Sequence, residues 1–295
     1  MDSLTVNPET CTKCGLCAEV CPARAIRHAA KALPAQDPER AAICIECGQC
    51  MAVCPSQSIV TGQLRYGQDF IPIAKSRIDY AMLFESLASR RSVRNFQPRP
   101  VPRELLEQII AAIELAPMGF PPHKTHLTVI QERAAVERLL PPMVSFFENM
   151  LRWIRNPIMR FFIRRDAGEE QFRTIQNHLI PIMKLRVPTM KQPNALDEIT
   201  RGAPVLILFH APISAEGHTA DAYIAMTYGL LAAHALGLGA TSISLVPPAI
   251  NKTPQLRDMV QLPPNHEVVT SIILGYPRFK YQRGIRRRLA SVHWR

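Results

Sequence analysis

Eight cysteines are the residues of this chain whose type and spacing could do chemistry most directly. All eight lie between positions 11 and 54, in two runs of identical spacing. The runs read Cys11-Thr-Lys-Cys14-Gly-Leu-Cys17-Ala-Glu-Val-Cys21-Pro22 and Cys44-Ile-Glu-Cys47-Gly-Gln-Cys50-Met-Ala-Val-Cys54-Pro55. The second run repeats the first at an offset of 33 residues, from Cys11 to Cys44. The pattern therefore indicates an internal duplication of a ligand-bearing segment.

The spacing favours iron–sulfur clusters over the two other common uses of cysteine. Neighbouring Cys-x-x-Cys steps are poor disulfide partners, and the chain carries no recognisable export signal. Structural zinc sites use pairs of cysteines separated by a longer spacer. A [4Fe–4S] cluster takes three thiolates from one tight loop and a fourth from elsewhere, and in bacterial examples a proline follows the fourth cysteine. We therefore expect two [4Fe–4S] clusters.

The two runs resemble those of bacterial two-cluster ferredoxins, over about residues 1–62. The resemblance implies that Cys11, Cys14, Cys17 and Cys54 hold one cluster. It implies that Cys21, Cys44, Cys47 and Cys50 hold the other. Gly15 and Gly48 suit a tight loop whose backbone N–H groups face the cluster sulfurs.

An arginine-rich segment is the second candidate site. The run Arg90-Arg91-Ser92-Val93-Arg94-Asn95-Phe96 follows a predicted helix. Three further features come after it in the chain, and these are Ala116-Pro117, the segment Leu230–Gly239, and Gly275-Tyr276-Pro277. In this order and spacing the four features resemble the nitroreductase family of FMN-dependent oxidoreductases, over about residues 80–295. The alternative is a solvated basic face beyond a helix.

A flavin mononucleotide suits such a segment chemically. FMN carries a phosphate but no adenylate, so arginines can bind it without a dinucleotide-binding loop. No Gly-x-Gly-x-x-Gly sequence occurs in the chain. The resemblance implies a set of FMN-binding residues: Arg90 and Ser92 at the phosphate, with Arg91 beside them, Arg94 near N1 and O2 of the flavin, Ser244 and Leu245 with their backbone near N5, and a tail arginine, Arg287 or its neighbours Arg283 and Arg286, completing the phosphate site.

The chain departs from the family pattern after Ala116-Pro117. Family members often carry Asn and Gln in the following loop, where this chain has Pro121 and His123. His123 is therefore a candidate catalytic proton donor to the substrate. The alternative is a histidine that is merely packed or solvated.

The predicted fold class is α+β, with a small ferredoxin-like domain followed by a nitroreductase-like α/β sandwich in which helices flank a mixed sheet. We expect the ferredoxin domain over residues 1–62, a linker over 63–79, and the FMN domain over 80–295. Helices are expected at 80–90, 102–116 and 221–238, and strands at 126–131, 204–211, 240–246 and 268–276. Residues 141–195 contain many prolines and are expected to form an insertion of several short helices.

The formal charge of +11 is unevenly distributed. Residues 1–60 carry five Lys or Arg and six Asp or Glu, a net of −1, which leaves +12 for the rest. We expect no nucleic-acid partner, because no helix-turn-helix or zinc-finger pattern is present. The basic stretch Arg152–Arg165 could form a lid over the flavin or a membrane-surface helix. The sequence favours the lid, so we expect no membrane association, and we expect a cytoplasmic location.

These features predict an iron–sulfur flavoprotein oxidoreductase. Electrons would pass from a low-potential donor, such as ferredoxin or flavodoxin, through two [4Fe–4S] clusters to FMN and on to an organic acceptor. Nitroaromatics, quinones and activated alkenes are the expected small-molecule acceptors. Two alternatives stay open: a non-catalytic subunit that hands electrons to a partner protein, and an FMN enzyme of this fold that performs dehalogenation or an oxidative reaction. The apolar helix 221–238 further indicates a homodimer.

Overall fold

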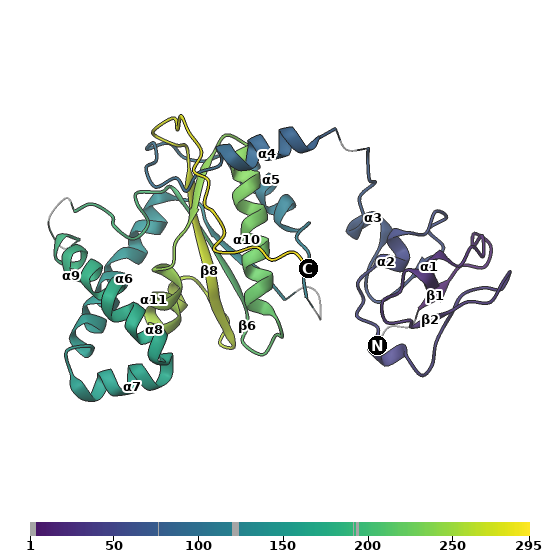
Figure 1. The fold of residues 1–295 in the computed structure, drawn as a ribbon, viewed down its shortest axis with the longest axis horizontal. Helices are drawn as coiled ribbons and strands as arrows, with labels where there is room; N and C mark the ends of the chain where they lie inside the picture. Colours follow the sequence, from purple (N-terminus) through teal and green to yellow (C-terminus); the bar gives the residue numbers. More distant parts are fainter. Residues whose placement is uncertain (1–3, 76, 120–123, 191, 193–194) are drawn as a thin grey trace. The chain divides into compact units, whose positions relative to one another are not determined.

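The chain forms two compact units, residues 1–79 and residues 80–119 with 124–295. The structure is a computed structural model, and it describes residues 4–75, 77–119, 124–190, 192 and 195–295 (Figure 1). Among these described residues, no helix is both long enough and apolar enough to cross a membrane. Each unit has its own hydrophobic core.

The first unit is built from short elements in two similar halves. They are β1 (Thr5–Val6), α1 (Leu16–Glu19), β2 (Ile26–Arg27), β3 (Ala35–Gln36), a 3-10 turn (Ala41–Ile43), α2 (Gln49–Ala52), β4 (Ile59–Val60) and α3 (Tyr66–Asp69). Strand β1 pairs with β4, and β2 pairs with β3, both antiparallel. Gly15 and Gly48 precede α1 and α2 with φ of 80° and 72°. Glycine adopts this left-handed conformation without strain, and a Cβ at Gly15 would lie 2.7 Å from the His28 ring.

The core of the first unit is small. Its buried members are Cys17, Ile26, Cys50, Met51 and Ile59. Tyr66 packs against this core, and its hydroxyl donates to the carbonyls of Met51 (3.2 Å) and Ile59 (3.0 Å). Residues 64–70, which the sequence assigned to the linker, therefore pack on the first unit. A unit with so little apolar core needs added cross-links, which the two expected clusters would supply.

The second unit is a four-stranded sheet with helices on both faces. Its elements are α4 (Tyr80–Ser89), α5 (Arg103–Ile113), β5 (His126–Ile130), α6 (Arg133–Trp153), α7 (Pro157–Ala167), α8 (Glu169–Thr174), a π-helical turn (Ile175–Leu179), α9 (Ile180–Thr189), β6 (Val205–Pro212), α10 (His218–Ala235), β7 (Gly239–Ser242), α11 (Val246–Lys252), α12 (Pro254–Met259) and β8 (His266–Gly275). The strand order is β5-β6-β8-β7, and all three pairings are antiparallel. A parallel bridge between Ser92 and Ala240 adds a short fifth segment, which makes the sheet mixed.

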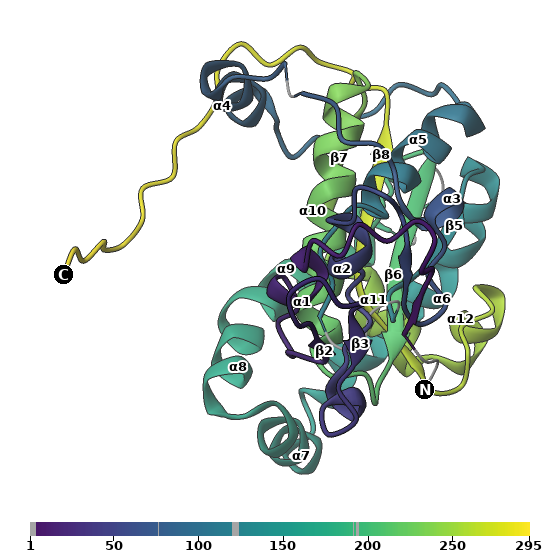
Figure 2. The same ribbon diagram turned by 90° about the vertical axis from the view of Figure 1, so that its right-hand side faces the viewer.

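Strand β6 is buried on both faces, because helices cover the sheet on each side (Figures 1 and 2). Val205, Ile207 and Phe209 pack in the cluster that contains residues of α5 and α10. Leu206 and Leu208 pack in the cluster that contains residues of α6, α9, α11 and α12. Side chains alternate between the faces of a strand, so a strand covered on both sides is apolar throughout.

The predicted strand 240–246 is too long. Strand β7 ends at Ser242, and α11 begins at Val246. Two prolines, Pro247 and Pro248, occupy the first turn of α11. That turn accepts proline because its backbone N–H groups lack partners within the helix, whereas a strand would lose hydrogen bonds.

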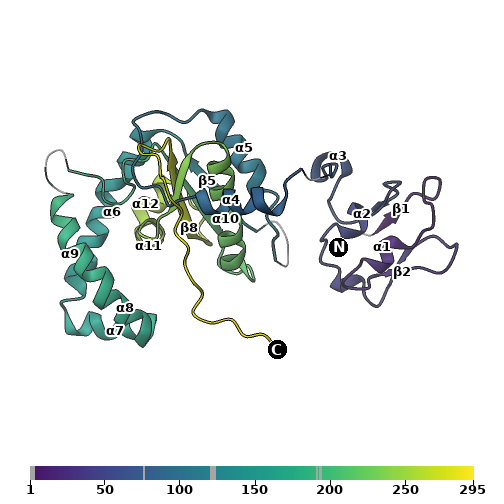
Figure 3. The same cartoon turned by 45° about the horizontal axis from the view of Figure 1, so that its top comes forward.

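The expected insertion of short helices from residue 141 is confirmed only in part, because α7, α8 and α9 are short but the helix that enters the insertion is long. Helix α6 runs unbroken from Arg133 to Trp153, although Pro141 and Pro142 lie inside it. Val136, Leu139, Met143 and Phe147 form one buried stripe along this helix. Packing of that stripe on the sheet compensates for the hydrogen bonds that the prolines remove. Helices α6 to α9 together make a helical arm, residues 133–189, that extends from the sheet (Figure 3).

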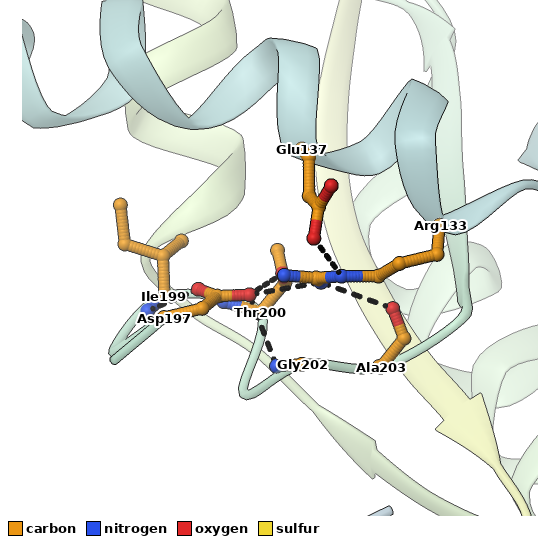
Figure 4. Close-up of polar contacts among 7 residues, drawn as sticks. All are labelled: Arg133, Glu137, Asp197, Ile199, Thr200, Gly202 and Ala203. Atoms are coloured by element: carbon orange, nitrogen blue, oxygen red, sulfur yellow. Dashed lines mark hydrogen bonds and ion pairs between the residues drawn. The ribbon is translucent and has the colours of Figure 1, made fainter. Parts of the chain in front are cut away.

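One buried carboxylate fastens the loop before β6 to the base of the helical arm (Figure 4). Asp197 accepts hydrogen bonds from the backbone N–H groups of Ile199 (3.0 Å), Thr200 (2.7 Å) and Gly202 (3.0 Å), and from the Thr200 hydroxyl. The Arg133 guanidinium donates to Asp197 (3.0 Å) and to the carbonyl of Ala203 (3.2 Å). The Asp197 side chain is 7% exposed and the Arg133 side chain 29%. The network therefore links the start of α6, where the arm begins, to the loop that leads from the arm into β6.

We expect Asp197→Asn to lower the free energy of unfolding by about 2–3 kcal/mol at pH 7, because the amide cannot satisfy Arg133 and the three N–H groups together. Urea denaturation followed by circular dichroism measures this. Glu137→Gln is the matched control, since Glu137 pairs with the same arginine (2.8 Å) from a position 56% exposed. We expect a loss of about 0.5 kcal/mol or less for that variant. Equal losses in the two variants would contradict the assignment.

The same carboxylate makes stability depend on acid pH. Burial alone would raise the pKa of Asp197, but hydrogen bonds from Thr200 and Gly202 and the charge of Arg133 outweigh burial and lower the pKa. The stabilisation is therefore complete above about pH 4, the ordinary aspartate value, and is lost as pH falls through the lower folded-state pKa. The Asp197→Asn variant should lack this part of the acid dependence.

Three histidines meet on neighbouring strands. His210 and His266 share a hydrogen bond between their Nδ1 atoms (2.9 Å), and His126 stacks on His210 with ring centroids 5.6 Å apart. Burial, then the neighbouring His266 and His126, lowers the pKa of His210 to about 4. The His210 ring is therefore neutral at pH 7 and serves the packing of the sheet.

Candidate cofactor sites

The eight cysteines surround two separate cavities in the first unit. One cavity is lined by Cys11, Cys14, Cys17 and Cys54. The other is lined by Cys21, Cys44, Cys47 and Cys50. Each set takes three thiols from one run and the fourth from the other run. These are the two ligand sets that the resemblance to ferredoxins implies.

The open arrangement of the thiols fits a cluster and does not fit a single ion. Among the described residues, no three His, Cys, Asp or Glu side chains converge closely enough to hold one metal ion. A tetrahedral zinc site brings its sulfurs within about 3.8 Å of each other, because each Zn–S bond is about 2.3 Å. A cubane binds each thiolate to a different iron, so its four sulfurs stay farther apart around a cavity.

Two of the thiols are buried, and burial disfavours their thiolate forms. Burial raises the pKa of Cys17, and it raises the pKa of Cys50 to about 11. Without a metal these thiols would stay protonated at neutral pH. Iron binding supplies the positive charge that stabilises the thiolate in such a site.

Hydrogen bonds to sulfur surround the fourth ligands. Ser58 donates to Cys54 Sγ from its backbone N–H (3.4 Å), and the backbone N–H of Ala25 donates to Cys21 Sγ (3.3 Å). Burial alone would raise the pKa of Cys54, but bonds from Ser58 and Ser56 outweigh burial and lower the pKa to about 7. Donors of this kind set the potential of a bound cluster. The sequence analysis did not identify these two serines. The pattern Ser56-Gln57-Ser58 directly after Pro55 could have indicated them as donors to the neighbouring cysteine.

The arginine-rich segment of the second unit is fixed at the free edge of strand β7. The backbone N–H of Val93 donates to the Ala240 carbonyl (3.2 Å), and Ser92 forms the parallel bridge with Ala240. A Cβ at Gly239 would lie 2.6 Å from Val93 Cγ1, so only glycine permits this approach. The local backbone thus holds Arg90 to Arg94 at one defined place.

The C-terminal tail returns to the same place. The backbone N–H of Arg278 donates to the Asn95 carbonyl (3.0 Å), and a Cβ at Gly284 would lie 2.4 Å from the Ala88 carbonyl oxygen. The Arg91 guanidinium lies 6.0 Å from the ring centroid of Tyr281. Arg283 and Arg287 follow Tyr281 in the sequence, on either side of Gly284. The tail backbone, nearly 200 residues later in the chain, therefore lies against the segment that carries Arg90 to Arg94.

The positive charge at this place is uncompensated. In the part of the chain that the structure describes, Arg90, Arg91 and Arg94 form no salt bridge, and the same holds for Arg283 and Arg287. Arg94 donates only to the Ser92 carbonyl (3.3 Å). Arginines without carboxylate partners suit a phosphate dianion, so the residues present fit FMN.

Two contacts that the sequence analysis did not foresee adjoin these arginines. His234 Nε2 lies 2.8 Å from the Ser89 hydroxyl, which joins the end of α4 to the end of α10. Burial, then the positive charge of Arg90, lowers the pKa of His234. Burial, then Arg186 and more weakly Arg94, lowers the pKa of Arg201, whose own charge is paired with Glu198 (2.9 Å). No local sequence pattern joins these positions, because only tertiary contacts do.

Two of the remaining predicted residues lie in the turn that follows β7. Ser244 is exposed and Leu245 half-buried, in the turn between β7 and α11. His123 lies outside the described residues. The start of its loop is held by Asp221 of α10, which accepts a hydrogen bond from the Gly119 backbone N–H (2.8 Å).

Comparison with known families defines the class of protein. Residues 87–276 match the nitroreductase family. The match covers well over half of the chain, and the chain belongs to the nitroreductase family. Residues 4–27 and 41–66 each match a 4Fe-4S binding domain. The chain thus joins two 4Fe-4S binding segments to a nitroreductase-family domain, which confirms the predicted family, fold class and cofactors.

Individual relatives are distant. An FMN reductase [NAD(P)H] from Bacillus subtilis is 24% identical over 196 residues, 66% of this chain and 66% of the relative. Iodotyrosine deiodinase 1 from Rattus norvegicus is 24% identical over 216 residues, 70% of this chain and 66% of the relative. The chain thus spans just under two thirds of the length of each. A nitroreductase with bound FMN from Bacteroides fragilis shares the fold at a TM-score of 0.53 and 19% identity, covering 72% of this chain and 97% of that one.

Proposed function

We propose that this oxidoreductase takes electrons from a low-potential donor, ferredoxin or flavodoxin, through two [4Fe–4S] clusters to FMN, and delivers them to a small organic acceptor. The acceptor class is a nitroaromatic, a quinone or an activated alkene. The observation that carries the proposal is the joining, in one chain, of two four-cysteine cavities with an uncompensated arginine site on a nitroreductase fold. Clusters supply single electrons, and a bound flavin supplies two-electron chemistry.

The residues of the chain have distinct parts in this proposal. The cysteines of each cavity hold one cluster. Arg90, Arg91 and Ser92, with Arg283 or Arg287 of the tail, bind the FMN phosphate. Arg94 places a cation beside the flavin ring, where it stabilises negative charge. Ser244, Leu245 and His123 keep their proposed roles at the ring edge and as proton donor.

A homodimer in the cytoplasm is part of the same proposal. No residue of α4 is buried, and Met82, Leu83, Phe84 and Leu87 leave apolar surface exposed. Helix α10 buries one face, yet Tyr223, Ile224 and Tyr228 are exposed on the other. Apolar surface of this extent is typical of an interface between subunits.

Anaerobic turnover tests the proposal. The protein, reduced with dithionite and freed of excess reductant, is mixed in turn with a nitroaromatic, a quinone, an activated alkene, a halogenated phenol and an oxidised flavodoxin. We expect repeated turnover with at least one of the first three when a reduced donor is resupplied, read as loss of acceptor. Oxidation by flavodoxin alone would instead support the non-catalytic subunit. Loss of halide from the phenol would support dehalogenation, the chemistry named for the distant rat relative.

A further inference from the structure

Helix α7 turns its basic side toward the rest of the helical arm. Arg164 forms an ion pair with Glu169 of α8, and the Arg160 guanidinium lies 6.0 Å from the ring centroid of buried Phe172. Asn156 caps the helix by accepting from the Ile158 backbone N–H (2.9 Å), and Pro157 stands in its first turn. The cap and the proline fix the start of the helix, and the contacts of Arg160 and Arg164 with α8 orient it.

The apolar side of α7 consequently faces solvent. Ile158, Met159 and Phe162 lie on one arc of the helix, and they are 65%, 38% and 53% exposed. Phe161, beside this arc, is 62% exposed. No residue from Pro157 to Asp166 is buried. An ordinary surface helix directs its apolar side toward the protein core. On α7 that side faces solvent, so we expect another molecule to cover it.

Trp153, at the end of α6 and four residues before α7, is also exposed. Five arginines lie between positions 152 and 165, and one exposed acidic residue of α7, Asp166, follows them. Within the described residues, Arg155 and Arg165 form no ion pair, whereas Arg164 pairs with Glu169. The patch, Trp153 with Ile158, Met159, Phe161 and Phe162, therefore lies in a segment of net positive charge that includes two unpaired arginines and one carboxylate.

The patch lies away from α4, one of the two surfaces assigned to the dimer. In all three views α7 lies at the far end of the helical arm, away from α4 (Figures 1, 2 and 3). An interface with a second basic copy would bring the arginines of both copies together. The positive charge of the arginines instead favours a partner with a negatively charged surface and an apolar interior.

We propose that α7 and the end of α6 form a membrane-surface contact with anionic lipids. The phenylalanines, Ile158 and Trp153 enter the interfacial layer, and the arginines contact lipid phosphates. Aromatic side chains combined with arginines are typical of helices that lie in this layer. The contact needs no span of the bilayer. The lid that the sequence favoured becomes an alternative outcome of the test.

Vesicle flotation with the full chain, carrying its clusters and FMN, tests this contact. We expect binding to vesicles of phosphatidylcholine and phosphatidylglycerol in a ratio of about 3:1, and little binding to phosphatidylcholine alone. The variant Phe161→Ser/Phe162→Ser should lower the partition coefficient about a hundredfold, because two aromatic side chains no longer leave water. The variant Arg155→Glu/Arg165→Glu should lower it more than about tenfold, on anionic vesicles only.

Matched controls separate the patch from exposed apolar residues in general. Leu196→Ser/Ile213→Ser changes two residues that are 79% and 59% exposed and lie outside the patch, and its binding should equal that of the wild type. Retained FMN absorbance shows that each variant is folded. The proposal is overturned if wild-type protein ignores anionic vesicles, or if Phe161→Ser/Phe162→Ser binds them equally well. A smaller molar mass of that variant in light scattering would likewise overturn it, by assigning the patch to a contact between copies.

Discussion

A protein that begins at Asp79 is expected to fold and to bind FMN, yet its turnover with reduced ferredoxin as sole donor should fall about a hundredfold or more. Both hydrophobic clusters of the second unit, and the arginine site, lie entirely within residues 80–295. The truncation removes the two cysteine cavities with their whole supporting core, since residues 64–70 pack on the first unit. A fused donor acts at high effective concentration, and this advantage is lost.

Chemical reduction provides the internal control for this truncation. The flavin of the truncated protein, reduced directly, should still reduce the acceptor at a rate near that of the full chain. Cys17→Ser in the full chain should reproduce the loss with ferredoxin, because it removes one ligand of one cavity. Iron analysis should show which clusters remain. If the truncated protein accepts electrons from ferredoxin as fast as the full chain, the clusters are not the point of entry.

The second large effect is expected at the arginine site. The double variant Arg90→Ala/Arg94→Ala should weaken FMN binding about a hundredfold or more, because each lost hydrogen bond to a charged group contributes about 1.5–3 kcal/mol. Equilibrium dialysis of the apoprotein against FMN measures the change. The potential of any retained flavin should also fall, since Arg94 no longer stabilises the reduced anion.

Two companion variants make this experiment specific. Arg103→Ala removes an exposed arginine of α5 that already pairs with Glu107 (2.8 Å), and it should leave FMN binding unchanged. Arg94→Lys keeps the charge and should keep most of the flavin potential, although it loses the planar guanidinium. Unchanged FMN affinity and potential in the double variant would show that these arginines are solvated surface only.

The cysteine runs show where sequence reasoning succeeds. Cluster ligation depends on a short, rigid loop, so the spacing of Cys11, Cys14 and Cys17 carries most of the information needed. The duplication then extends the inference to the second run. The family and the cofactors, predicted from these runs and from four short motifs, are confirmed.

Secondary structure could be predicted where one local signal dominates. Strand β6 was predicted closely. A continuous apolar run that follows Pro204 and is too short for a helix is typical of a strand covered on both faces. Helix α6 was not predicted, because Pro141 and Pro142 locally disfavour a helix. The packing of Met143 and Phe147 stabilises the helix nevertheless. The predicted strand at β7 was too long, because the apolar Val246 was assigned to the strand. Val246 instead begins α11, whose first turn contains Pro247 and Pro248.

By itself, then, the sequence determined the chemistry: eight thiols at cluster spacing, arginines able to bind a phosphate, and the family that combines them. The tertiary structure decided which groups meet. It set the tail against Ala88 beside Arg90, joined Ser89 to His234, and turned the apolar side of α7 outward. Local spacing encodes contacts within a loop or a turn. Contacts between segments 100 or more residues apart, and the rotation of a helix about its axis, depend on packing that no single segment contains.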